Sequence, residues 1–212
     1  MTPTFPDISI STERLVLRSF DEGDVPALTA MMNDELVAAR NAAPAPCTEA
    51  DAREWVVRRA PAVRADGDGL ALAMADVLTG RLVGGLRLRR TDWRLRTAEA
   101  YCATAPWARG EGYACESLLG LVQWLFQDQK FERLEPRTAA DNTAAQQVAQ
   151  KLGCVSEGVL RSAWITRTRA ADGTWQQART DLIVWSLLPE DLDGLPERIA
   201  QAGGAVPRAD WT

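Results

Sequence analysis

The chain has 212 residues, of which 46% are hydrophobic, and a formal net charge of -5. This length and apolar content predict a single domain spanning residues 1–212, with its core at about 12–188 and a C-terminal tail at 189–212. The acidic balance disfavours nucleic acid as a partner, because phosphate backbones are held chiefly by clustered Lys and Arg. The sequence has no histidine, which excludes Ser-His-Asp and Cys-His catalysis.

The four cysteines are scattered and show no CxxC pairing. We therefore expect neither a disulfide framework nor a bound metal. The chain has no basic segment followed by an apolar run at its start, and no stretch of about 18 apolar residues, so we expect no membrane association. Reduced thiols are typical of a cytoplasmic location, which we predict here.

The first half of the chain predicts a strand, two helices and a hairpin. Residues 12–18 alternate apolar and polar side chains, as a strand does. Acidic caps and an early proline predict a helix from Val25 to about Ala39, and a cap at Thr48 predicts a second, short helix. A mostly apolar run at 70–78 and an alternating run at 81–90 flank a Thr-Gly turn and predict a hairpin.

The second half alternates strands with helices. A strand at about 97–105 precedes a helix over 113–129, and a strand near 131–138 precedes a helix that is capped by Asp141 or Asn142 and ends at Gly153. Two further strands, joined at 171–173, end near residue 188. The tail from Glu190 shows no clear pattern. This order of elements predicts an α/β fold.

The loop between the strand at 97–105 and the following helix is rich in glycine. Gly110 and Gly112 leave the backbone free, so that several N–H groups can converge on an anion where the helix dipole is positive. Arg109 supplies a charge for the same anion, and a pyrophosphate would fit such a nest. The glycines could instead form only a tight turn, and the GxGxxG and GxxxxGK[ST] nucleotide signatures are missing.

The segment Arg109-Gly110-Glu111-Gly112-Tyr113-Ala114 resembles the (Gln/Arg)-x-x-Gly-x-(Gly/Ala) acyl-coenzyme A motif of Gcn5-related N-acetyltransferases (GNAT). Within that superfamily the chain is similar to the branch that acetylates the N-termini of ribosomal proteins. The resemblance spans roughly residues 12–188. The other segments that carry it are Thr12 to Arg18, Glu116, Asp141 to Ala145, Lys151-Leu152-Gly153, Glu157 to Arg161, and Asp181 through Leu187-Leu188.

The resemblance implies a binding site for acetyl-coenzyme A (acetyl-CoA), the acyl donor. Its pyrophosphate would be cradled by the backbone of Arg109, Gly110, Gly112, Tyr113 and Ala114. The backbone of Thr104 and Ala105 would pair with the pantetheine arm, and Asn142 would hydrogen-bond the coenzyme. Two of these residues have simpler interpretations, since Asn142 could be only a helix cap and Arg109 only a surface charge.

The resemblance also implies a mixed, mainly antiparallel sheet of about seven strands, flanked by helices and splayed after the fourth strand to admit the coenzyme. Related enzymes often dimerise, so we expect a homodimer.

Amine acetylation needs a neutral amine and a means of neutralising the departing thiolate. Glu99, which aligns with a glutamate of the resembled branch, is the predicted base, although it could instead be an exposed residue or pair with Arg96. Relatives often carry a serine or a tyrosine as the general acid at two positions in the last predicted helix. The residues at these positions here are Ala145 and Ala149. Tyr101 or water is therefore expected to protonate the thiolate.

A small buried thiol is the default interpretation of Cys102 and Cys115, so neither is assigned as a nucleophile. We therefore predict direct transfer to the amine, without an acyl-enzyme intermediate. The acceptor could be a peptide N-terminus, a small polyamine-like metabolite or an amine-bearing antibiotic. An amine pocket could be lined by Trp93, Trp107, Trp164 and Trp175, whereas Trp55, Trp124 and Trp185 read as core.

Two alternatives remain open. One is transfer from succinyl-CoA, which would need an extra cation from Arg87, Arg89 or Arg94. The other is a non-catalytic CoA-binding sensor, which the absent hydroxyl residues motivate.

Overall fold

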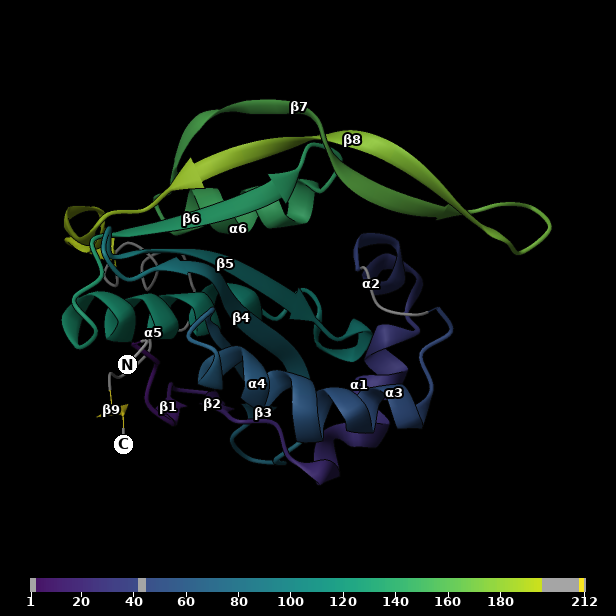
Figure 1. The fold of residues 1–212 in the computed structure, drawn as a ribbon, viewed down its shortest axis with the longest axis horizontal. Helices are drawn as coiled ribbons and strands as arrows, with labels where there is room; N and C mark the ends of the chain where they lie inside the picture. Colours follow the sequence, from purple (N-terminus) through teal and green to yellow (C-terminus); the bar gives the residue numbers. More distant parts are fainter. Residues whose placement is uncertain (1–2, 42–44, 196–209, 212) are drawn as a thin grey trace.

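The computed structural model describes residues 3–41, 45–195 and 210–211. One sheet runs through this part of the chain, with its strands in the order β7-β8-β6-β5-β4-β3-β2-β1-β9 (Figure 1). The strands are β1 (Ile10–Ser11), β2 (Leu15–Arg18), β3 (Leu70–Asp76), β4 (Leu82–Asp92), β5 (Thr97–Thr104), β6 (Arg133–Ala139), β7 (Val155–Arg169), β8 (Trp175–Ser186) and β9 (Asp210–Trp211).

The helices are α1 (Val25–Met32), α2 (Glu35–Arg40), α3 (Glu49–Glu54), α4 (Ala60–Ala65), α5 (Tyr113–Gln127) and α6 (Thr143–Lys151). A π-helical segment, Trp55–Arg59, joins α3 to α4, and 3-10 turns occur at Glu22–Asp24, Pro106–Ala108 and Pro189–Leu192. The predicted mixed, mainly antiparallel sheet is confirmed. The seven expected strands are all present, and the two-residue strands β1 and β9 add to them.

Three boundaries differ from the sequence prediction. The predicted helix over 25–39 is two helices, because the Asp34 carboxylate accepts hydrogen bonds from the amides of Leu36 and Val37 and so starts α2 afresh. The first predicted strand begins at Leu15, since the Thr12 amide turns back onto the Leu15 carbonyl. Strand β9 pairs with β1 within the predicted irregular tail, whose residues 196–209 and 212 lie outside the described residues.

Successive side chains of the central strands enter two different cores, as the pleat of a sheet requires. Leu72 and Met74 of β3 pack in the larger core with α5, whereas Ala73 between them packs with α1 and α3. The larger core also takes in Phe5 and Leu195, outside the expected limits of 12–188. The sheet is therefore covered by α5 on one face and by the α1–α4 region on the other.

The sheet opens between β5 and β6. These strands pair in parallel from Thr97 and Arg133 as far as Ala100 and Pro136, and the pairing stops there. Beyond that point β6 pairs only with β8, through Arg137–Ala139. The predicted splay after the fourth long strand, β5 in this numbering, is confirmed.

Candidate active site

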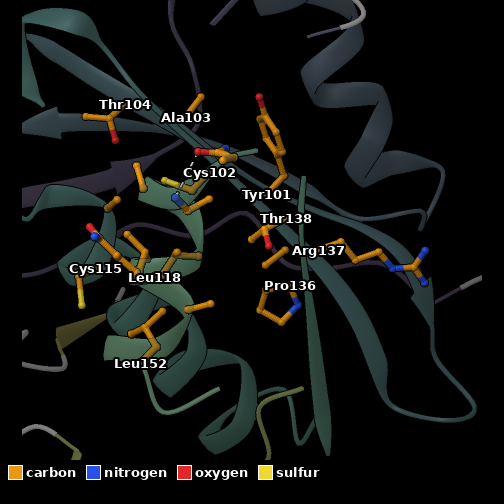
Figure 2. Close-up of a pocket in the computed structure, with 18 of the residues that line it drawn as sticks. Tyr101, Cys102, Ala103, Thr104, Cys115, Leu118, Pro136, Arg137, Thr138 and Leu152 are labelled. Carbon is orange, nitrogen blue, oxygen red and sulfur yellow. Dashed lines mark hydrogen bonds between the residues drawn. The ribbon is translucent and has the colours of Figure 1, made fainter. Parts of the chain in front are cut away.

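A cavity of about 640 Å³ occupies the opening between β5 and β6. Tyr101 to Thr104 of β5 line one side of it, and Pro136 to Ala139 of β6 line the other. Figure 2 shows Tyr101 on β5 and Pro136 and Arg137 on β6, and Cys115, Leu118 and Leu152 on the helices beside the opening. Because β5 has no strand beside Tyr101–Thr104 on this edge, the backbone N–H and C=O groups that point into the cavity have no strand to pair with.

The glycine-rich loop closes one end of the cavity. Gly110 and Gly112 both have left-handed backbone, with φ values of 82° and 80°, a conformation that L side chains rarely adopt. Gly112 is the N-cap of α5, so the first amides of that helix have no acceptor within the helix. Gly110, Gly112, Tyr113 and Ala114 all line the cavity. The loop thus has the left-handed glycines and the helix N-terminus on which the predicted pyrophosphate nest depends.

Arg109 lines the same end, where its guanidinium forms a bidentate ion pair with Asp34. Partial burial opposes ionisation of Asp34, but hydrogen bonds from Arg109 and from the Val37 amide outweigh it and lower the pKa of this carboxyl. The Arg109 guanidinium is thus paired with Asp34, the N-cap residue of α2, beside the glycine-rich loop.

Of the two residues predicted to meet a pantetheine arm, only Thr104 lines the cavity. Ala105 is fully buried, its amide donates to the Val83 carbonyl at 2.9 Å, and its carbonyl accepts from Ala108 at 2.9 Å. Asn142 lines the cavity and also caps α6, because its side chain accepts from the Ala145 amide at 3.3 Å. The helix-cap interpretation of Asn142 therefore holds, and within the described residues its side-chain N–H groups have no hydrogen-bond acceptor.

Glu116, on the first turn of α5, forms hydrogen bonds with the residues just before β2 and so links the glycine-rich loop to that strand. Its side chain is 2% exposed. One carboxylate oxygen accepts from the Thr12 hydroxyl at 2.6 Å and the Arg14 amide at 2.8 Å, and the other accepts from Arg14 Nε at 2.7 Å. The Arg14 guanidinium also lies over the Tyr113 ring, 4.7 Å from its centroid. Glu116 belongs to the segments that carry the family resemblance, but the sequence did not predict its contacts with Thr12 and Arg14, because these residues lie more than 100 positions away.

Glu99 lies on the face of β5 that also carries Tyr101, as alternation predicts, but it is 3% exposed and does not line the cavity. Its carboxylate is bound by Arg89, and its second oxygen lies 3.4 Å from Arg90 and 3.7 Å from Arg137. The ion-pair interpretation of Glu99 holds, with these arginines in place of Arg96. The structure therefore gives the predicted base no direct path to a ligand in the cavity.

The Tyr101 side chain lines the cavity. Burial raises the pKa of its hydroxyl, and the nearby charges of Arg89 and Arg40 offset only part of this rise. Tyr101 is therefore protonated at neutral pH.

Burial also raises the pKa of the Cys102 thiol to about 12, and that of Cys115 above its usual range. Both remain neutral thiols at pH 7, the state that is least reactive as a nucleophile.

The tryptophans divide differently from the prediction. Trp164 lines the cavity and lies under Arg89, 5.8 Å from the guanidinium carbon to the ring centroid. Trp93 stacks in the core against Phe5, with ring centroids 4.6 Å apart, and Trp107 donates to the Leu82 carbonyl at 3.0 Å. Trp124 and Trp185 are core residues as expected. Only Trp164 of the four proposed lining residues reaches the cavity.

Two further properties of the described residues bear on the chemistry. They contain no group of three or more Asp, Glu or Cys side chains placed to hold a metal ion. None of their helices has both the length and the apolar character needed to cross a bilayer.

Comparison with known proteins identifies the family. A family profile described as "Acetyltransferase (GNAT) domain" matches residues 14–155, two thirds of the chain. The protein is a GNAT acetyltransferase. A comparison with curated proteins gives no significant match.

Solved GNAT structures share the fold at low sequence identity. Mycobacterium smegmatis RimJ in complex with CoA-disulfide has a TM-score of 0.77 at 22% identity, covering 97% of this chain and 99% of its own. A GCN5-related N-acetyltransferase from Brucella melitensis has a TM-score of 0.75 at 18% identity, covering 94% and 86%. Spermidine N-acetyltransferase from Vibrio cholerae in complex with CoA and spermine has a TM-score of 0.68 at 18% identity, covering 84% and 96%. These likenesses concern the fold alone.

Proposed function

We propose that this acetyltransferase transfers the acetyl group of acetyl-CoA directly to a primary amine. The observation that carries the proposal is the cavity between β5 and β6, with a glycine-rich helix N-terminus at one end and an unpaired strand edge along its side. A ligand that joins a pyrophosphate to an amide-containing arm matches these two features in the order in which they occur. The GNAT fold and the CoA ligands of its solved relatives support the same donor.

In this proposal the amides of Gly110, Gly112, Tyr113 and Ala114 hold the pyrophosphate, because they converge at the positive end of α5. Arg109 adds a cation there, and the side-chain amide of Asn142 offers a further donor. The open edge of Tyr101–Thr104 pairs with the amides of the pantetheine arm. Acetyl-CoA supplies the activated thioester, and this chain supplies binding and orientation.

Tyr101 is the group that we assign to proton donation. Tyr101 lines the cavity and its hydroxyl is protonated at neutral pH, so we assign it as the group that gives a proton to the departing thiolate. Glu99, which is enclosed by guanidinium groups, is assigned a positioning role, in which it holds Arg89 and Arg137 at the cavity wall. The buried neutral cysteines leave direct attack by the amine as the simplest route.

The test is calorimetric titration of acetyl-CoA into the wild type and into Gly112→Asp. The new carboxylate lies in the nest and repels the pyrophosphate, so we expect micromolar binding by the wild type and a loss of about 100-fold or more in the variant. The matched control is Gly80→Asp, because Gly80 has a similar left-handed φ of 67° and open space around it but lies in the β3–β4 turn. Absence of binding by the folded wild type would overturn the proposal.

A further inference from the structure

The acceptor side of the cavity carries a row of arginines. Alternate residues of β4 point to the same face of the sheet, so Arg87 and Arg89 lie on the face that holds Glu99 and Tyr101 of β5. Each of the two guanidinium groups lies over an aromatic ring, Arg87 over Trp55 at 5.5 Å and Arg89 over Trp164 at 5.8 Å. The row thus combines fixed cations with flat apolar surfaces.

Tyr101 lies within this row. Arg87 is its cross-strand neighbour on β4. Arg89, and Arg40 at the end of α2, both line the cavity with it. The charges of Arg40 and Arg89 both act to lower the pKa of the Tyr101 hydroxyl. Tyr101 therefore lies near three arginines, two of which line the cavity with it.

The carboxylates in this region do not match the cations in number. The arginines are Arg40, Arg87, Arg89, Arg90, Arg133 and Arg137, and the acids that pair with them are Glu99, Glu135, Asp141 and Glu157. Within the described part of the chain Arg87 forms no ion pair, and Asp68 acts on it only at longer range. The region therefore keeps an excess of positive charge.

Three of these arginines also have unused donors. The Nε atoms of Arg40, Arg87 and Arg137 are buried, and none of them has a hydrogen-bond acceptor among the described residues. Burial and the neighbouring charge of Arg89 lower the pKa of Arg87, which means that its cation is unfavourably placed when no anion is nearby. An anion that met these donors would satisfy both the charge and the hydrogen-bonding requirement.

We propose that Arg40 and Arg89, which line the cavity, and Arg87, which lies next to Tyr101 on β4 outside the lining, form a subsite for a carboxylate, so that one of the two substrates carries a carboxylate close to its reacting group. This inference rests on the proposed function and names its substrate class. The carboxylate can come from an acceptor such as an amino acid, or from the acyl chain of a donor such as succinyl-CoA. A polycationic acceptor such as spermine would meet the arginines with like charge, so the site disfavours it.

The experiment measures binding, so that its outcome does not depend on finding a turnover assay. Matched amines that differ only in a carboxylate or a carboxamide, such as β-alanine and β-alaninamide or glycine and glycinamide, are titrated into CoA-saturated protein. Succinyl-CoA and acetyl-CoA are titrated into free protein. The same titrations use Arg40→Gln, Arg87→Gln and the control Arg58→Gln, whose side chain is 76% exposed and lies on the π-helical segment away from the cavity.

We expect one source of carboxylate to bind at least about tenfold more tightly than its neutral match. Preference among the amines identifies the acceptor as the source, and preference between the thioesters identifies the donor. Arg87→Gln and Arg40→Gln should each reduce the preference severalfold while CoA itself binds as in the wild type, and Arg58→Gln should leave it unchanged. Equal binding of charged and neutral members in both series, or a preference that survives both variants, overturns the subsite. Failure of the wild type to bind CoA would instead count against the proposed function.

Discussion

Two buried glutamates, neither of which lines the cavity, lie beside the glycine-rich loop and on the strand that carries Tyr101, and their surroundings differ. Glu116, at the coenzyme end, is 2% exposed, and each of its oxygens is bound by nearby donors from Thr12 and Arg14. Glu99, at the acceptor end, is 3% exposed and lies among three arginines, and its second oxygen has no hydrogen bond within the described residues. The hydrogen bonds of Glu116 are all satisfied and its charge is paired with Arg14. Glu99 instead belongs to a group of side chains with more arginines than carboxylates.

The difference separates a structural role from a selective one. Glu116, whose hydrogen bonds are all satisfied, holds the glycine-rich loop in place for the acyl donor, whichever acceptor is bound. An unbalanced network is more costly to bury, and it can be completed by a ligand of the right charge. We infer that the coenzyme end serves the common acyl donor, while the acceptor end distinguishes among substrates.

The largest expected effect comes from Glu116→Gln. Glu116 is buried but Arg14 is partly exposed, so weakening these charge-assisted hydrogen bonds should lower the free energy of unfolding by about 2 kcal/mol. Denaturant unfolding measures this change. The matched control is Glu157→Gln, because Glu157 also pairs with an arginine, Arg133, but its side chain is 41% exposed; that variant should lose less than about 1 kcal/mol. Equal losses in the two variants would remove the distinction between buried and exposed contacts.

A smaller effect is expected from Glu99→Gln. If Glu99 positions Arg89 and Arg137, kcat should fall about tenfold or more at every pH, with acetyl-CoA affinity unchanged. A general base would behave differently, because raising the pH toward the amine pKa supplies neutral amine and restores the rate. The pH profile of kcat, measured with an amine that binds in the titrations proposed above, separates the two roles. Recovery at alkaline pH would return Glu99 to the role of base that the sequence suggested.

The smallest effect is expected from Asp34→Asn, and it is a gain. Asparagine still caps α2, but it no longer neutralises Arg109. The freed guanidinium is then available to the pyrophosphate, so acetyl-CoA should bind about two- to fivefold more tightly by calorimetry. Arg109→Gln in the Asp34→Asn background should abolish the gain. Unchanged affinity in Asp34→Asn would mean that Arg109 does not contact the coenzyme.

The coenzyme end could be predicted from the sequence because its parts are local. Gly110, Gly112 and the start of α5 lie within a few residues of one another, so the sequence alone places a glycine-rich turn at a helix N-terminus. The same holds for Asn142, whose cap is formed with Ala145. Local chemistry also accounts for the strands and for the order of the helices.

The acceptor end could not be predicted in the same way, because it depends on contacts between distant segments. The register that sets Arg87 opposite Tyr101, and the packing that brings Arg40 and Trp164 to the same wall, follow from the tertiary fold. The division of the first helix was missed for a related reason, since Asp34 reads equally well as a surface residue until its hydrogen bonds to α2 are seen.

The long β7–β8 hairpin gives this arrangement an order of assembly. Its strand β7 rests on α2, where the Thr166 hydroxyl donates to the Ala39 carbonyl at 3.3 Å across 127 residues of sequence (Figure 1). Contacts so far apart in the chain require costly loop closure and form late in folding. As the chain emerges from the ribosome, the glycine-rich loop and the row of arginines are both made before β7 and β8, whereas Trp164 on β7 reaches the cavity wall only when the hairpin packs on α2. Trp164 is therefore the last part of the cavity wall to be put in place.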